Sequence, residues 1–150
     1  MANELSTKVN EIVQYVVIKV GEEQFGVDIQ YIDNIVRMQN ITRVPKVPAY
    51  LKGVINLRGE VIPVMSLRLK MEMDTDEITK DTRIIIIKMN QHDGIGILVD
   101  AVKEVVSLNA ADIERVSFEN RDENTPFVQG IGKQGDSLIS LLDLHAVLQE

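Results

Sequence analysis

The stretch that decides the fold reads Gly53-Val54-Ile55-Asn56-Leu57-Arg58-Gly59-Glu60-Val61-Ile62-Pro63-Val64. Two apolar runs rich in valine and isoleucine flank the polar sequence Leu57-Arg58-Gly59-Glu60. Branched apolar residues favour strands, and glycine readily adopts the positive φ that tight turns need. The stretch therefore predicts a β-hairpin with strands over residues 53–57 and 60–66.

Further segments along the chain have the same character, being short, apolar and bounded by Gly, Asn, Asp or Pro. They are Tyr15–Val20, Gln24–Ile29, Arg83–Met89, Gly94–Val99, Val102–Ser107, Phe127–Gly132 and Leu138–Leu142. The 19 valines and 18 isoleucines of the chain support the same interpretation. Many short strands joined by tight turns indicate a mainly β protein, built as a sandwich or small barrels.

Helices are predicted to be few and short. Ile32, Ile35 and Val36 have helical spacing, which predicts an amphipathic helix over Asp28–Met38. Its apolar stripe would pack in the core or line a groove for a partner helix. Three further short helices are expected at Leu67–Met73, at Ala110–Arg115 with Asn109 or Asp112 as cap, and at Asp143–Leu148 with Asp143 as cap.

The two halves of the chain resemble each other. At an offset of 70 residues, Phe25–Ile29 falls on Ile95–Val99, and at an offset of 77, residues 61–67 fall on 138–144. A unit of about 65–70 residues buries only ~60% of its surface and is marginal alone. We therefore expect two similar units that share an apolar interface, approximately residues 14–80 and 81–150, after a polar segment over residues 1–13.

Composition excludes several classes of protein. The chain has 150 residues, no cysteine and a net charge of −7, so disulfide scaffolds and thiolate metal sites are excluded and nucleic-acid binding is disfavoured. Its apolar runs are far shorter than the ~20 residues of a membrane span, so no direct membrane insertion is expected. No export signal is visible, which predicts a cytoplasmic location.

Motifs for catalysis are missing. The chain has neither a G-x-S-x-G elbow nor a Walker loop, and Gly130–Gly135 lacks the Ser or Thr that should follow Lys133. His92, in a predicted turn, and His145, in the terminal helix, have no paired-ligand spacing. Paired catalytic carboxylates are not excluded, although nothing singles out a pair. The sequence thus predicts no catalytic residue, no metal site and no cofactor.

Arg58 has two interpretations. An isolated arginine in a turn is usually solvated, whereas a positioned guanidinium can pair with a carboxylate of the same chain or of a partner. The spacing alone favours neither.

Over roughly Gln14 to Leu148, the chain resembles the CheW family of bacterial chemotaxis coupling proteins. The hairpin sequence G-V-x-N-L-R-G followed by P-V is the most specific part of the match. The other stretches that carry it are Phe25–Ile29, Ile41–Pro45, Tyr50–Lys52, Leu67-Arg68 and Gly96–Asp100.

The resemblance implies two SH3-like, five-stranded β-barrel subdomains that share a hydrophobic core, with a few short helices. It implies an adaptor without catalysis that links the cytoplasmic tips of methyl-accepting chemoreceptors to the regulatory domain of the histidine kinase CheA. The alternative is a double-barrel protein of another pathway that binds a peptide or a small ligand; a hydrolase is a distant third.

The resemblance also implies site residues. Receptor binding is expected at Ile32, Asn34, Ile35, Gly53, Arg58 and Gly96, and kinase binding at Arg83, Arg115, Phe118 and Leu142. Better-known members carry glutamate where this chain has Asn34, and that glutamate is thought to pair with the arginine that matches Arg58. Since Asn34 cannot form this ion pair, Arg58 is expected to meet Asp33, Glu60 or a carboxylate of a partner.

Overall fold

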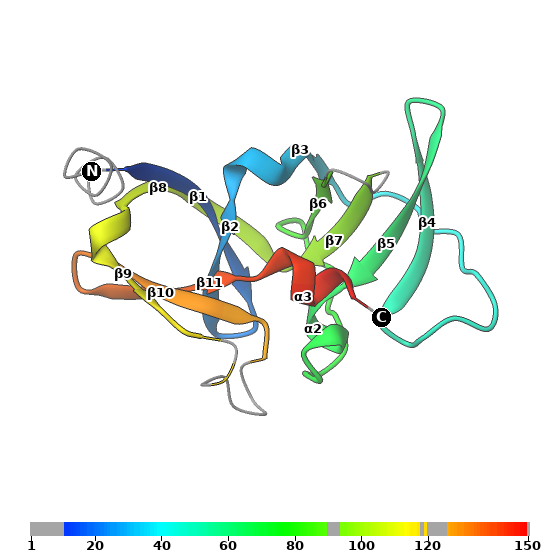
Figure 1. Cartoon of the computed structure of the whole chain (residues 1–150). Coiled ribbons are helices and arrows are strands. Elements are labelled where there is room, and N and C mark those ends of the chain that lie inside the picture. Colours follow the sequence, from blue (N-terminus) through cyan, green and yellow to red (C-terminus); the bar gives the residue numbers. More distant parts are fainter. Residues whose placement is uncertain (1–10, 90–93, 118, 120–125, 150) are drawn as a thin grey trace. The chain divides into compact units, whose positions relative to one another are not determined.

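The computed structural model describes residues 11–89, 94–117, 119 and 126–149. It separates into two units (Figure 1). The terminal unit contains residues 1–18, 24–30 and 103–150, and the central unit contains residues 19–23 and 31–102. Among the residues that the structure describes, no helix is long and apolar enough to cross a membrane.

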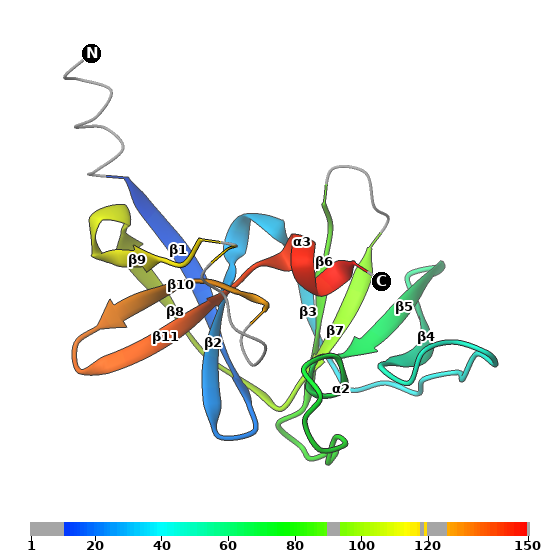
Figure 2. The ribbon, with the colours of Figure 1, turned by 60° about the horizontal axis from the view of Figure 1, so that its bottom comes forward.

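The terminal unit is built on one sheet with the strand order β8-β1-β2-β11-β10-β9. Alternate side chains of its strands form a core that includes Tyr15 and Val17, Val106 and Leu108, and Ile139 and Leu141, because successive residues of a strand face opposite sides. Figure 2 shows the hairpin of β10 and β11 beside β9. The strands are β1 (Ile12–Val20), β2 (Glu23–Asp28), β8 (Ala101–Asn109), β9 (Ile113–Arg115), β10 (Val128–Gln134) and β11 (Ser137–Leu142).

The central unit is built on a second sheet with the order β3-β6-β7-β5-β4. Its core contains Ile55, Ile62, Val64, Ile84, Ile86 and Leu98, with Ile41 packed against them. The strands are β3 (Ile32–Arg37), β4 (Leu51–Leu57), β5 (Glu60–Ser66), β6 (Arg83–Ile87) and β7 (Ile95–Val99).

Short helices follow the last strand of each repeat, as predicted. Ser66 caps α2 (Leu67–Lys70) by accepting a hydrogen bond from the Leu69 amide. Asp143, 77 positions later, caps α3 (Leu144–Leu148) through the Ala146 amide. The 3₁₀ turns are η1 (Ile29–Tyr31) and η2 (Ala110–Asp112), and Asn109 caps η2.

Strand pairing confirms the internal repeat. Val64 of β5 lies opposite Gly96 of β7, and Leu141 of β11 lies opposite Gly26 of β2, both in parallel pairs. These positions are related by the offsets of 77 and 70 residues. Each parallel pair joins a strand of one half of the sequence to a strand of the other half. Such neighbours are far apart along the chain, because a tight turn cannot connect parallel strands. The units of the structure are therefore not the contiguous stretches 14–80 and 81–150.

All nine predicted strands are present, and the mainly β fold is confirmed. The predicted helix over Asp28–Met38 is wrong, because the chain forms strand β3 after η1. This strand pairs with β6, with Ile32 opposite Ile87 at one end and Arg37 opposite Arg83 at the other. Exposure along β3 alternates with a period of two. Residues 113–115 form β9 instead of a helix end, which gives the terminal sheet six strands where five were expected. The shared core stays a prediction.

Candidate functional site

Three of the predicted receptor-binding residues lie on one row across the central sheet. The row runs through the register partners Asn34, Ile86, Gly96, Val64 and Gly53. Ile86 and Val64 have no exposed surface and belong to the core of the unit. Sequence analysis could not find this row, because its members come from five different strands.

The two glycines of the row serve the packing of their own unit. A Cβ atom on Gly96 would lie 2.7 Å from Cγ2 of Ile84, inside the core. Gly53 has a φ of 143°. A Cβ atom there would overlap the carbonyl oxygen of Thr42. Two backbone hydrogen bonds of 2.8 Å hold Thr42 against Val54, so this oxygen cannot easily move away. Both glycines are buried, so the close approach they permit is to this chain itself.

Strand β3, at one edge of the central sheet, carries the other apolar candidates. Ile32 is half-buried, whereas Ile35 is 36% exposed. The side-chain oxygen of Asn34 accepts a hydrogen bond from the Ile35 amide at 2.8 Å. Asn34 is thus held by the local backbone, and Ile35 offers apolar surface beside an edge that other strands can approach.

Arg58 lies at the tip of the hairpin formed by β4 and β5. Its φ of 54° and the 83° of Gly59 are both positive, as in a type I′ turn, and Oδ1 of Asn56 accepts a hydrogen bond from the Gly59 amide. Arg58 is exposed and, within the described ranges, has no ion pair or side-chain hydrogen bond. Asp33 lies 3.9 Å from Lys88 instead. The expected pairing of Arg58 with Asp33 or Glu60 is therefore wrong, and a partner carboxylate stays a prediction.

The predicted kinase-binding residues differ widely in exposure. Arg115 is exposed at the end of β9, an edge strand of the terminal sheet. Arg83 is half-buried, and its Nη1 donates to the carbonyl oxygens of Lys80 and Thr82. Leu142 is only 2% exposed. Phe118 and His92 lie outside the described residues.

A polar cluster that the sequence analysis missed joins three segments of the central unit. Nε of Arg68 donates to Oδ1 of Asp100 at 2.9 Å, Nη2 donates to Oδ2, and the Gly21 amide donates to Oδ2 at 2.8 Å. Burial by itself raises the pKa of Asp100, but the hydrogen bonds from Arg68 and Gly21 outweigh it and hold that pKa below its usual value. Arg68 and Asp100 are far apart in sequence, and the available signal was that both lie in stretches that carry the family resemblance.

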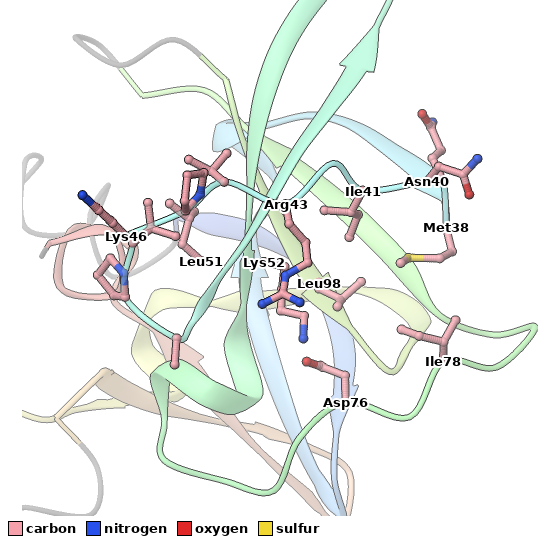
Figure 3. Close-up of a pocket in the computed structure, with 16 residues that line it drawn as sticks. Met38, Asn40, Ile41, Arg43, Lys46, Leu51, Lys52, Asp76, Ile78 and Leu98 are labelled. Carbon is pink, nitrogen blue, oxygen red and sulfur yellow. The ribbon is translucent and has the colours of Figure 1, made fainter.

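A pocket of about 1080 Å³ lies elsewhere in the central unit (Figure 3). It is lined by residues of the connection between β3 and β4 and by Asp76, Ile78 and Leu98. Basic side chains on its walls are Arg43, Lys46 and Lys52. Where the chain is described, no group of three or more His, Cys, Asp or Glu residues is arranged to hold a metal ion.

A family model, two curated relatives and a solved structure agree on one family. The model of the CheW-like domain matches residues 14–150. Chemotaxis protein CheW of Helicobacter pylori is 35% identical over 140 residues, which cover 93% of this chain and 84% of that protein. The Bacillus subtilis CheW is 33% identical over 135 residues, which cover 90% and 86%. The crystal structure of the scaffolding protein TtCheW from Thermoanaerobacter tengcongensis superposes with a TM-score of 0.84, at 33% identity and with 93% and 94% of the two chains covered.

Proposed function

This chain belongs to the CheW family, and we propose that it couples methyl-accepting chemoreceptors to the histidine kinase CheA as a chemotaxis scaffold. The observation that carries the scaffold role is the likeness to a scaffolding protein over nearly the whole of both chains. The names of the curated relatives support the place in chemotaxis. They favour this role over a ligand-binding protein of another pathway.

Coupling by a scaffold needs no chemistry of its own. A protein that holds a receptor and a kinase at the same time raises the effective concentration of one at the other. If it binds two receptor conformations with different affinity, it also biases the state of the kinase. The absence of catalysis, the cytoplasmic location and the association with receptor arrays are parts of this proposal.

For the receptor contact we propose the hairpin tip and β3. Arg58 supports this because the turn fixes its backbone, while its exposed guanidinium has no internal partner among the described residues. It can pair with a carboxylate on a receptor helix. Ile35 would add exposed apolar contact from β3. Gly53 and Gly96 would act indirectly, through the packing of the sheet that carries these residues.

For the kinase contact we propose the edge of the terminal sheet that ends in β9. Arg115 is the exposed candidate there. An edge strand has backbone groups that another β domain can pair with. Leu142 would support this surface from within its own sheet, since it is buried in β11. Arg83 belongs to the central unit, where it binds backbone carbonyls beside it, so its kinase contact is a separate part of the proposal.

The proposal is tested by calorimetric titration of the full chain with the isolated regulatory domain of a cognate CheA. Saturable 1:1 binding is expected for the wild type and for Arg58→Ala, and loss of binding is expected for Arg115→Glu. Asp136→Ala, at the tip of the equivalent hairpin between β10 and β11, is the matched control for Arg58→Ala in a receptor pulldown. Absence of binding at about 100 μM kinase domain would overturn the kinase contact.

A further inference from the structure

The pocket of the central unit concentrates positive charge in an acidic protein. Arg43, Lys46 and Lys52 line it together with one carboxylate, Asp76. The chain as a whole carries a net charge of −7. In the described part of the chain, none of the three cations has a salt bridge or a side-chain hydrogen bond. Because charges are screened beyond about 8 Å at physiological salt, a ligand in the pocket meets these cations and not the distant acidic surface.

Apolar side chains complete the walls of the pocket. Met38, Ile41 and Leu98 lie on one side of it, with Leu98 buried in the core of the unit (Figure 3). Val44 and Ile78 also line it and are 38% and 53% exposed. An occupant would therefore be recognised by apolar contact as well as by charge.

The walls are held in place before any ligand binds. Thr42 is bridged to Val54 of β4, and the Leu51 amide donates to the Pro48 carbonyl at 3.0 Å. On the opposite wall, the Ser66 hydroxyl donates to Oδ2 of Asp76 at 2.6 Å. A preformed site loses less conformational entropy on binding than a mobile one.

The charged and the apolar groups of the lining lie at different places along the pocket. Figure 3 shows Lys46 at one end and Ile78 at the other, with the side chains of Arg43, Lys52 and Asp76 converging between them. A peptide segment that carries both acidic and apolar side chains can reach both kinds of group. Its carboxylates would lie by Arg43, Lys46 and Lys52, and an apolar side chain would reach Ile78.

We propose that this pocket binds an acidic peptide segment of a partner protein, with apolar side chains between the acidic ones. The residues that carry the inference are Arg43, Lys52 and Ile78. None of them belongs to the surfaces proposed for the receptor and the kinase, so the pocket is a third docking site and its test is independent of the scaffold role.

The test is a titration of the full, isotope-labelled chain with a synthetic peptide of repeated Glu-Leu-Ser units, followed by amide NMR shifts. Saturable shifts are expected at residues that line the pocket. Peptides with Lys in place of Glu, or Ser in place of Leu, are expected to bind at least about tenfold more weakly, because each lacks one of the two kinds of contact.

Variants connect the shifts to the proposed side chains. Arg43→Glu, Lys52→Glu and Ile78→Ser are each expected to weaken binding at least about fivefold, whereas Lys133→Glu, on an exposed position of β10, leaves it unchanged. Arg43→Gln repeats the test should a charge reversal disturb folding, which the spectrum of the free variant reports.

Four results would overturn the proposal. The first is no saturable shift up to about 5 mM peptide. The second is equal binding by the wild type and the pocket variants. The third is equal shifts with free glutamate, which would assign the site to small anions. The fourth is shifts of the pocket amides with protein concentration alone, which would assign it to a second copy of the chain.

Discussion

Gly96 lies directly opposite Val64 in the parallel pair of β7 and β5, and the space above its Cα is filled by Ile84. Gly26 has the same relation to Leu141 in the terminal unit, where a Cβ atom would lie 2.8 Å from Cδ2 of Leu141. In each unit, a glycine of a parallel pair thus lies against a large core residue, which is Ile84 of the antiparallel neighbour β6 for Gly96 and the parallel partner Leu141 for Gly26. The packing of each core therefore explains why glycine is needed at these two positions, and no contact with a partner protein has to be invoked.

Gly96→Ala and Gly26→Ala should each lower the free energy of unfolding by about 1–3 kcal/mol, because the added methyl group forces the core to shift. Urea unfolding measures the change. Gly94→Ala is the comparison, since its nearest neighbour would be 3.3 Å away, and a smaller loss is expected there. If Gly96→Ala kept full stability and lost only receptor binding, Gly96 would be a contact residue and the packing argument would fail.

Arg58→Ala should leave the melting temperature unchanged and reduce receptor pulldown, because the side chain is exposed and has no internal partner in the described residues. Arg58→Lys should recover part of the binding, since it keeps the charge but loses the planar fork of donors. Asp136→Ala should bind receptors like the wild type. Equal losses in the melt and the pulldown would indicate that Arg58 acts through the fold.

Asp100→Asn should lower the free energy of unfolding at pH 7 by about 1–3 kcal/mol, because Arg68 loses a charged partner in a largely buried position. The pKa of Asp100 is lowered by folding from an ordinary value of 3.8, so the folded state binds fewer protons between the two values. The contribution of the Asp100 carboxylate to the free energy of unfolding is therefore complete above about pH 5. It is lost as the pH falls through the pKa of Asp100 in the folded state.

Urea unfolding at about pH 7, 5 and 3 measures this dependence. The difference between the wild type and Asp100→Asn should be large at the two higher values and shrink at the lowest. A difference that is the same at all three would mean that the carboxylate charge of Asp100 contributes nothing. Asp112→Asn, at an exposed residue of η2, is a control for the loss of one acidic charge.

Leu142→Ala should lower the free energy of unfolding by about 2–5 kcal/mol, because its buried side chain packs in the interior and its removal leaves a cavity. Arg115→Ala should leave the melting temperature unchanged and weaken the kinase contact. Thermal melts paired with calorimetric titration separate the two effects. If Leu142→Ala kept the stability of the wild type and bound the kinase more weakly, Leu142 would contact the kinase directly and the packing argument would be wrong.

Several features of this fold could be predicted locally. The nine strands and the turn at Arg58-Gly59 follow from apolar runs bounded by turn residues, and the caps Asn109 and Asp143 lie where a short polar side chain precedes a helical turn. The repeat was also visible, because offsets of 70 and 77 residues preserve the order of apolar positions. Each of these signals lies within a few residues along the chain, or in a comparison of two short stretches.

The predicted helix over Asp28–Met38 shows where such signals fail. Ile32, Ile35 and Val36 match helical spacing, but three apolar residues are compatible with either period. Pairing with β6 decided the outcome, since the backbone groups of β6 need a partner and β3 supplies it. The family resemblance named Asn34, Gly96 and Gly53 one by one, and only strand pairing places them on one row, where neighbours from other strands bury the two glycines.

Nine of the strands, the turns, the caps and the doubled pattern follow from local sequence, because these depend on side chains close together in the chain. The folded arrangement sets which half of the sequence contributes strands to which sheet, because parallel pairs join segments that no turn connects. It also decided that Arg68 meets Asp100, that Arg58 is left without an internal partner in the described residues, and that three cations line one pocket. These relations depend on distances across the fold, which no local pattern of residues records.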